Sequence, residues 1–189
     1  MEPKGYLALV LHAHLPFVRH PEHDRFLEED WFFEALTETY LPLLEVFEGL
    51  AGHGAHFRVT MSLTPTLLSM MTDPLLQERY VRYLDERLEA LEGERRRTQG
   101  DPYFHPVVLF YSDLYARLRR RYLEKDGKDI TRAFRRLMDA GHLDILTCGA
   151  THGYFPLLAV NEESLYAQLS MAVRTHRRIL GRHPRGIWL

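Results

Sequence analysis

The sequence has one cysteine, a near balance of charge and no long apolar run, and each of these scarcities excludes a class of protein. A lone Cys148 cannot form an internal disulfide, which is typical of a reducing compartment. The 24 Lys and Arg side chains nearly offset the 26 Asp and Glu side chains, which argues against a nucleic-acid partner. No run approaches the roughly twenty apolar residues of a membrane span, and the N-terminus lacks the apolar core and cleavage site of a secretory signal. We therefore expect a cytoplasmic protein without a membrane partner.

The sequence also lacks several motifs that mark catalytic or cofactor sites. It has no Gly-rich phosphate loop, Ser nucleophile elbow or Cys-x-x-Cys metal clamp. Two arginine clusters, 95–97 and 119–121, lie among glutamates and indicate solvated helix faces more than a polyanion site. Histidine and aromatic residues are instead abundant, at 11 residues and 12% of the chain. Such side chains commonly gather where polar ligands bind, although a single histidine is as often a surface or core residue.

The hydrophobic pattern predicts an α/β fold in which strands alternate with helices. The first strand, 5–12, is a continuous apolar run typical of a strand that is buried on both faces. Further strands are predicted at 56–61, 142–148 and 186–189. Helices are predicted at 31–50, from 64 onward, at 73–92, 104–124, 129–140 and 161–180, with N-caps at Thr64, Asp73, Asp129 and Asn161. Pro42 is expected to kink or split the first of these helices.

The order of these elements predicts the N-terminal part of a parallel barrel. The helical stretch 64–140 is far longer than a standard crossover between parallel strands, so we interpret it as an insertion or helical layer beside the sheet. Four strands with their helices amount to about half of a (β/α) barrel, which typically needs about 250 residues. Because the chain stops inside an apolar strand, we expect the rest of the barrel to lie outside these residues.

Three histidines lie where two predicted strands end. His12 and His14 follow the first strand, and residues two apart in a strand point to the same face. His152 lies in the glycine-containing loop 149–160, after the third strand. Because ligands bind at the carboxyl ends of parallel strands, we expect the three rings to share one cleft. By spacing alone, the pair His12 and His14 could bind a metal, contact a polar substrate or support the loop.

Two further residues have a functional and a structural interpretation. Trp31 follows the long, partly acidic loop 13–29, where an exposed indole could stack on a sugar ring, but a core-facing indole at a helix start is equally common. Cys148 has no basic neighbour in the sequence, which favours a buried structural thiol over a reactive one.

Three segments resemble the conserved regions of glycoside hydrolase family 57. Residues 11–22, LHAHLPFVRHPE, resemble the first region, whose strand ends in His-x-His-x-Pro. Residues 148–156, CGATHGYFP, resemble the second region, and residues 186–189, GIWL, resemble the opening of the third. The resemblance covers the whole chain in order and spacing, and it is closest to the α-1,4-glucan branching enzymes of that family.

The resemblance implies a (β/α)7 barrel that acts on α-1,4-glucan by a retaining mechanism, without a cofactor or a metal. In such a mechanism a glutamate forms a glycosyl-enzyme and an aspartic acid serves as acid and base. The family glutamate follows the third-region tryptophan, here Trp188, in a Trp-x-Pro-Glu pattern, so we expect neither catalytic carboxylate within these residues. The matching positions His12, His14 and His152, and less closely Trp31, are then expected to bind substrate.

Two rival interpretations remain at this stage. One is a metal-dependent hydrolase of the amidohydrolase type, in which the His-x-His pair binds zinc together with later histidines and an aspartate. The other is a non-catalytic glucan-binding relative that kept the barrel and lost its carboxylates.

Overall fold

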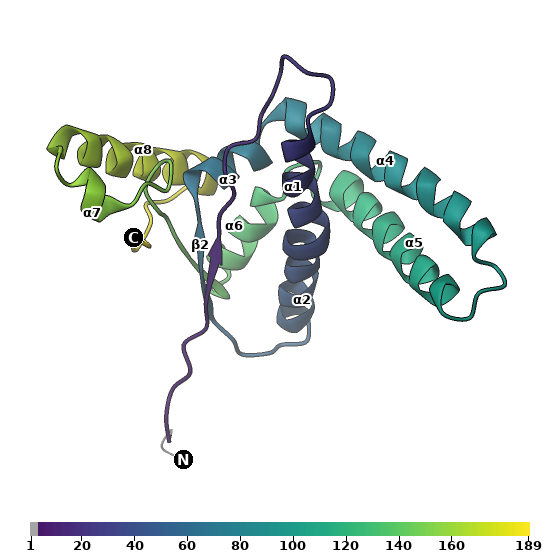
Figure 1. The fold of residues 1–189 in the computed structure, drawn as a ribbon. Coiled ribbons are helices and arrows are strands. Elements are labelled where there is room, and N and C mark those ends of the chain that lie inside the picture. Colours follow the sequence, from purple (N-terminus) through teal and green to yellow (C-terminus); the bar gives the residue numbers. More distant parts are fainter. Residues whose placement is uncertain (1–3) are drawn as a thin grey trace. The chain divides into compact units, whose positions relative to one another are not determined.

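The computed structural model, drawn as a ribbon in Figure 1, describes residues 4–189, and the chain divides into two compact units. The first unit combines the chain up to Phe17 with Val46–Thr72 and Thr131–Leu189. The second unit combines Val18–Glu45 with Asp73–Ile130. Each unit is thus assembled from separate stretches of sequence. Within the described residues, no helix is both long enough and apolar enough to span a bilayer.

The first unit is built on a parallel three-stranded sheet. Its strands are β1 (Val10–Ala13), β2 (Val59–Leu63) and β3 (Leu143–Leu146), in the order β1-β2-β3. Both strand pairs are parallel, so all three carboxyl ends lie at one edge of the sheet. The α/β class and the order of the first three predicted strands are confirmed.

Two strand predictions need correction. The segment before β1 is not a buried strand, because Tyr6 is 93% exposed and Leu7 is 95% exposed. The pairing between β1 and β2 begins at Val10 and Thr60, so residues 5–8 precede the paired part of β1. The predicted strand 186–189 is reduced to a single parallel bridge between Ile187 and Thr147.

Helices flank this sheet, and two of the caps that the sequence predicts are confirmed. Thr64 caps α3 (Pro65–Met71) by accepting the Leu67 N–H, and Asn161 caps α8 (Glu162–Leu180) by accepting the Ser164 N–H. The predicted cap Asp129 lies two residues before the start of α6 (Thr131–Asp139), and its capping role stays a prediction.

One helix of the first unit was not expected from the sequence. The predicted loop 149–160 contains the one-turn helix α7 (Phe155–Leu158), which packs on α8. A single turn with a proline inside it has no periodicity long enough to be recognised.

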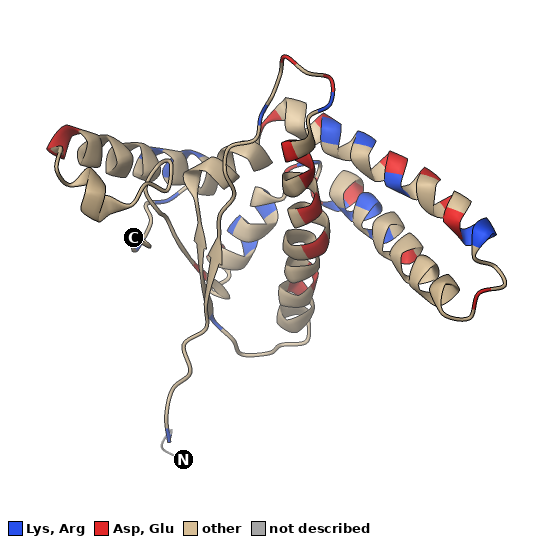
Figure 2. Ribbon diagram, viewed as in Figure 1, with Lys and Arg blue, Asp and Glu red and all other residues tan. Residues whose placement is uncertain are grey.

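The second unit is entirely helical in its described secondary structure. Its long helices α4 (Pro74–Arg97) and α5 (Phe104–Arg120) pack as a hairpin, and a π-helical segment, η2 (Arg121–Lys125), continues α5. Both basic and acidic side chains occur along α4, as Figure 2 shows. The prediction of solvated arginine clusters is wrong for Arg121, which is buried and donates to Asp126.

The helix before Pro42 begins earlier than predicted and is not split. Helix α1 (Leu27–Ala35), the π-helical turn η1 (Leu36–Tyr40) and α2 (Leu41–Gly52) form one continuous run. Acidic residues 28–30 occupy the first turn of α1, where the helix dipole favours negative charge. The π-helical turn immediately before Pro42 accommodates the missing N–H and the bulk of the proline ring.

Candidate functional site

The three histidines that the sequence singled out come together in the first unit. The ring centroids of His14 and His152 are 4.2 Å apart, those of His12 and His152 are 4.9 Å apart, and those of His12 and His14 are 6.3 Å apart. The predicted proximity of these residues is confirmed across a separation of about 140 positions in the sequence. We refer to His12, His14 and His152 as the histidine cluster.

An indole ring joins the histidine cluster. The Trp188 ring centroid lies 5.8 Å from that of His12, and the backbone N–H of Trp188 donates to the Thr147 carbonyl at 2.8 Å. Thr147 directly follows β3, so Trp188 is held at the carboxyl edge of the parallel sheet. Ligands of parallel α/β folds bind at this edge.

Hydroxyl groups on β2 and directly after it hold two of the three imidazoles. His12 Nδ1 lies 2.5 Å from Ser62 Oγ, and His14 Nδ1 lies 3.2 Å from Thr64 Oγ1. Both hydroxyl-bearing residues are buried. Sequence reasoning gave Thr64 only a helix-capping role and gave Ser62 none. The available signal was their spacing of two, which matches that of the histidines on the neighbouring strand.

A tight loop positions the third histidine. The backbone of His152 has φ 56°, a left-handed conformation that costs a non-glycine residue about 1 to 2 kcal/mol. Its N–H donates to the Gly149 carbonyl at 3.0 Å. Gln168 of α8 holds Thr151, the residue before His152, through two hydrogen bonds. Its side chain accepts the Thr151 N–H at 2.9 Å and donates to the Thr151 hydroxyl at 2.8 Å. Gln168 is a second contributor to the site that the sequence did not reveal.

The two glycines that flank His152 leave room for α7. A Cβ at Gly149 would lie 2.5 Å from the Phe155 ring, and one at Gly153 would lie 2.7 Å from Leu158 Cδ1. A side chain at either position would therefore have to displace the Phe155 or Leu158 side chain of α7.

Two members of the histidine cluster, His12 and His14, are uncharged at neutral pH. Partial burial, together with the proximity of His152 and His12, lowers the pKa of His14 to about 4. Burial, followed by the proximity of His152, also lowers the pKa of His12. A neutral imidazole has one donor and one acceptor, which suits contacts with hydroxyl groups.

Two further candidate residues are Trp31 and Cys148. Trp31 belongs to α1 in the second unit and is 53% exposed, so its predicted contact with a sugar stays a prediction. Cys148 is fully buried, and burial raises the pKa of its thiol, as the structural interpretation predicts.

A metal-binding interpretation of the cluster needs a set of ligands around one point. Within residues 4–189, no group of three or more His, Cys, Asp or Glu side chains is arranged to hold a metal ion. The amidohydrolase-type alternative therefore has no ligand set in the described part of the chain.

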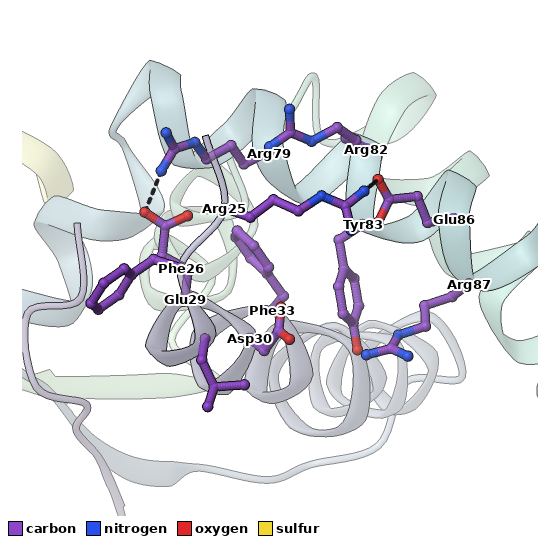
Figure 3. A pocket seen from close by; sticks show the side chains of 11 residues that line it. Arg25, Phe26, Glu29, Asp30, Phe33, Arg79, Arg82, Tyr83, Glu86 and Arg87 are labelled. Atoms are coloured by element: carbon purple, nitrogen blue, oxygen red, sulfur yellow. Dashed lines mark hydrogen bonds and ion pairs between the residues drawn. The ribbon is translucent and has the colours of Figure 1, made fainter. Parts of the chain in front are cut away.

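The second unit contains a separate charged pocket of about 270 Å³, seen in Figure 3. Arg79 donates to Glu29 there at 2.5 Å, and Arg25 donates to Glu86. Arg79 also donates to the His20 carbonyl at 3.1 Å. The charged side chains of the pocket pair with one another, and these ion pairs hold the loop that contains His20 against α1 and α4.

Comparisons with known proteins identify the family. A model of glycosyl hydrolase family 57 matches residues 8–189. The 1,4-alpha-glucan branching enzyme TK1436 of Thermococcus kodakarensis is 36% identical over 98% of this chain. Its crystal structure, in complex with glucose and additives, matches with a TM-score of 0.89.

Two other solved structures are equally similar. The GH57-type branching enzyme from Pyrococcus horikoshii has a TM-score of 0.91 and 35% identity over 99% of this chain. The alpha-amylase AmyC from Thermotoga maritima has a TM-score of 0.91 and 40% identity over 96% of this chain. The chain spans 34% of each of these two structures and 27% of the curated TK1436 sequence. Since the family model covers nearly all of its residues, the chain belongs to glycosyl hydrolase family 57.

Proposed function

We propose that this chain forms the N-terminal part of the catalytic (β/α)7 barrel of an enzyme that acts on α-1,4-glucan. The observation that carries the proposal is the convergence of the histidine cluster and Trp188 at the carboxyl edge of a parallel sheet, in a member of family 57. The stretch 64–140 is proposed as the mostly helical insertion of that barrel. The chain covers about a third of each related structure, which supports its assignment to one part of a larger barrel.

The chemistry of these side chains matches a sugar. Neutral imidazoles exchange hydrogen bonds with hydroxyl groups, and the apolar face of Trp188 can stack on the C–H face of a pyranose ring. We assign His12, His14 and His152 to contacts with the glucose unit beside the scissile bond, and Trp31 to the donor side. No Asp or Glu of this chain is assigned the role of nucleophile or acid/base, and no cofactor is required.

We further propose that the reaction is branching: cleavage of an α-1,4 linkage followed by transfer of the glucan chain to a 6-hydroxyl. The similarity to two branching enzymes over nearly the whole chain supports this choice. Simple hydrolysis is the second candidate, because the most identical of the three solved relatives is described as an alpha-amylase. The two reactions differ in the acceptor, which is a sugar hydroxyl in branching and water in hydrolysis.

Incubation of the full-length protein with amylose separates the candidates. Branching creates α-1,6 linkages, measured by proton NMR or after treatment with a debranching enzyme, with few new reducing ends. Hydrolysis creates reducing ends without branch points. If a chelator abolishes the activity and zinc restores it, the amidohydrolase-type mechanism replaces ours, and binding of glucan without any turnover indicates a non-catalytic relative.

Substitution of the cluster gives a second test. We expect His12→Ala and His14→Ala to lower turnover about thirty- to several-hundred-fold, because each loses a contact worth about 2 to 4 kcal/mol in the transition state. Circular dichroism and the thermal midpoint should stay near those of the unaltered protein. An unchanged turnover in both variants would remove these residues from the site.

A further inference from the structure

The positions of Ser62 and Thr64 relative to the histidines are set by strand register. In the parallel pair of β1 and β2, His12 is the partner of Ser62. Two residues on, the Thr64 N–H donates to the Ala13 carbonyl at 3.2 Å, which continues the ladder toward His14. Each imidazole thus meets a hydroxyl through Nδ1, and in both rings Nε2 is the other nitrogen.

The hydrogen bonds of Thr64 can be assigned one by one. Its Oγ1 accepts the Leu67 N–H at 3.3 Å and lies 3.0 Å from Thr66 Oγ1. The Thr66 hydroxyl donates its only proton to the Leu15 carbonyl at 3.2 Å, so Thr64 must donate in the contact between the two hydroxyls. A hydroxyl has one proton and two acceptor positions. Thr64 therefore has only an acceptor position left for His14.

The consequence for His14 follows from its charge state. Its pKa of about 4, lowered first by burial, leaves the ring with a single proton at neutral pH. Because Thr64 can only accept, that proton resides on Nδ1, and Nε2 carries a lone pair.

Ser62 likewise holds an imidazole ring, that of His12, but its other contact differs from those of Thr64. Its hydroxyl contacts His12 Nδ1 and the buried Cys148 thiol. All three groups lie on adjacent strands or at their ends, so the His12 ring is held from the core side of the sheet.

We propose that Ser62 and Thr64 are positioning residues, and that Thr64 holds His14 in the Nδ1–H tautomer so that Nε2 accepts a hydrogen bond from a substrate hydroxyl. The identity of that hydroxyl as part of a sugar rests on the proposed function; the tautomer does not. His14 then selects a ligand that donates an O–H at this point, and an analogue lacking that hydroxyl leaves the Nε2 lone pair without a partner.

The tautomer can be measured without substrate. In the full-length protein labelled with nitrogen-15 at histidine, long-range proton–nitrogen correlation at pH 7 distinguishes Nδ1–H, Nε2–H and charged rings, and loss of one signal set in His14→Gln assigns His14. We expect the Nδ1–H pattern. An Nε2–H or a doubly protonated His14 overturns the proposal.

Substitutions at Thr64 test the cause. Thr64→Val removes the acceptor and should give a mixture of His14 tautomers, together with a three- to tenfold lower kcat, the usual range for one neutral hydrogen bond. Thr64→Ser keeps the hydroxyl and should restore both. Thr72→Val is a matched control, because it removes a hydroxyl that bonds Leu68 and Ser69 carbonyls at the other end of the same helix. It should change neither readout.

The outcomes separate the two proposals. A Thr64→Val protein whose His14 spectrum is unchanged refutes the positioning role, whatever its activity. If Thr64→Val does not fold, the spectra of the unaltered protein and of Thr64→Ser still decide the tautomer. A protein that has the predicted tautomer but no activity on amylose contradicts the proposed function alone.

Discussion

The buried ion pair between Arg79 and Glu29 should dominate the local stability of the loop that follows the first strand. Their side chains are 8% and 2% exposed, and the closest atoms are 2.5 Å apart. Arg79 also donates to the carbonyls of His20 and His23, and Glu29 accepts the His20 N–H at 3.1 Å. Arg79→Ala would leave a carboxylate buried without its charge partner, which costs about 3 to 5 kcal/mol.

Amide hydrogen exchange of residues 18–26 in the full-length protein measures this loss. At about 1.4 kcal/mol per factor of ten, exchange in this loop should accelerate about a hundred- to several-thousand-fold. Arg82→Ala is a matched control on the same helix, because Arg82 pairs with Asp24 at the surface, where the two side chains are 41% and 85% exposed. A surface pair contributes at most about 1 kcal/mol, so the control should change exchange about fivefold or less.

Two results would refute this reasoning. Equal acceleration in Arg79→Ala and Arg82→Ala would mean that burial does not strengthen the pair. A double variant, Arg79→Met with Glu29→Leu, removes both charges and should recover most of the protection, since apolar replacement of a buried pair is often neutral or stabilising. A double variant as unstable as the single one would show that the backbone contacts of Arg79, and not its charge, hold the loop.

Three further predictions concern the site. Gly149→Ala should lower the free energy of unfolding by about 1 to 3 kcal/mol, measured by denaturant titration, because its Cβ would meet the Phe155 ring at 2.5 Å. His152→Gly should lower activity on amylose at least tenfold while leaving the thermal midpoint unchanged or higher, because the φ of 56° is strained for histidine and free for glycine; a lower midpoint would argue against strain. Because the pKa of His14 is lowered to about 4 in the folded chain, the unfolded chain binds more protons between pH 4 and 6.5, so the free energy of unfolding should fall as the pH falls through that window. His14→Gln should flatten that slope.

The sequence predicts those elements whose ends carry their own chemical signal. Thr64 and Asp73, each followed by proline, and Asn161 mark three helix starts, and all three cap the helices that follow them. The segment 5–8 is misread because apolar composition does not specify a neighbour, and this segment precedes the contact of the Leu9 carbonyl with the Thr60 N–H, at which β1 meets β2. The start of α1 is missed because its acidic first turn resembles a loop when only apolar periodicity is considered.

The sequence likewise predicts some residues of the candidate site and misses others. His12, His14 and His152 are recognisable because each follows a predicted strand, and parallel strands bring their carboxyl ends together. Gln168 is not recognisable in advance, since its contact with Thr151 depends on how α8 packs against the loop, and Ser62 is marked only by its spacing of two from Thr64. Sequence pattern therefore locates the groups that face a ligand more readily than the groups that hold them.

The discontinuous second unit constrains any attempt to exchange parts between members of the family. A chimera that takes this unit from a relative needs four crossover points, after Phe17, Glu45, Thr72 and Ile130. One of these crossovers falls inside the continuous helix α2, where donor and recipient sequences would have to share a helical register. The crossover after Thr72 separates α3 from Asp73, the cap of α4, so the capping residue should be inherited with its helix. The unit that recombination would have to exchange is therefore a pair of segments, Val18–Glu45 and Asp73–Ile130, and not one continuous stretch.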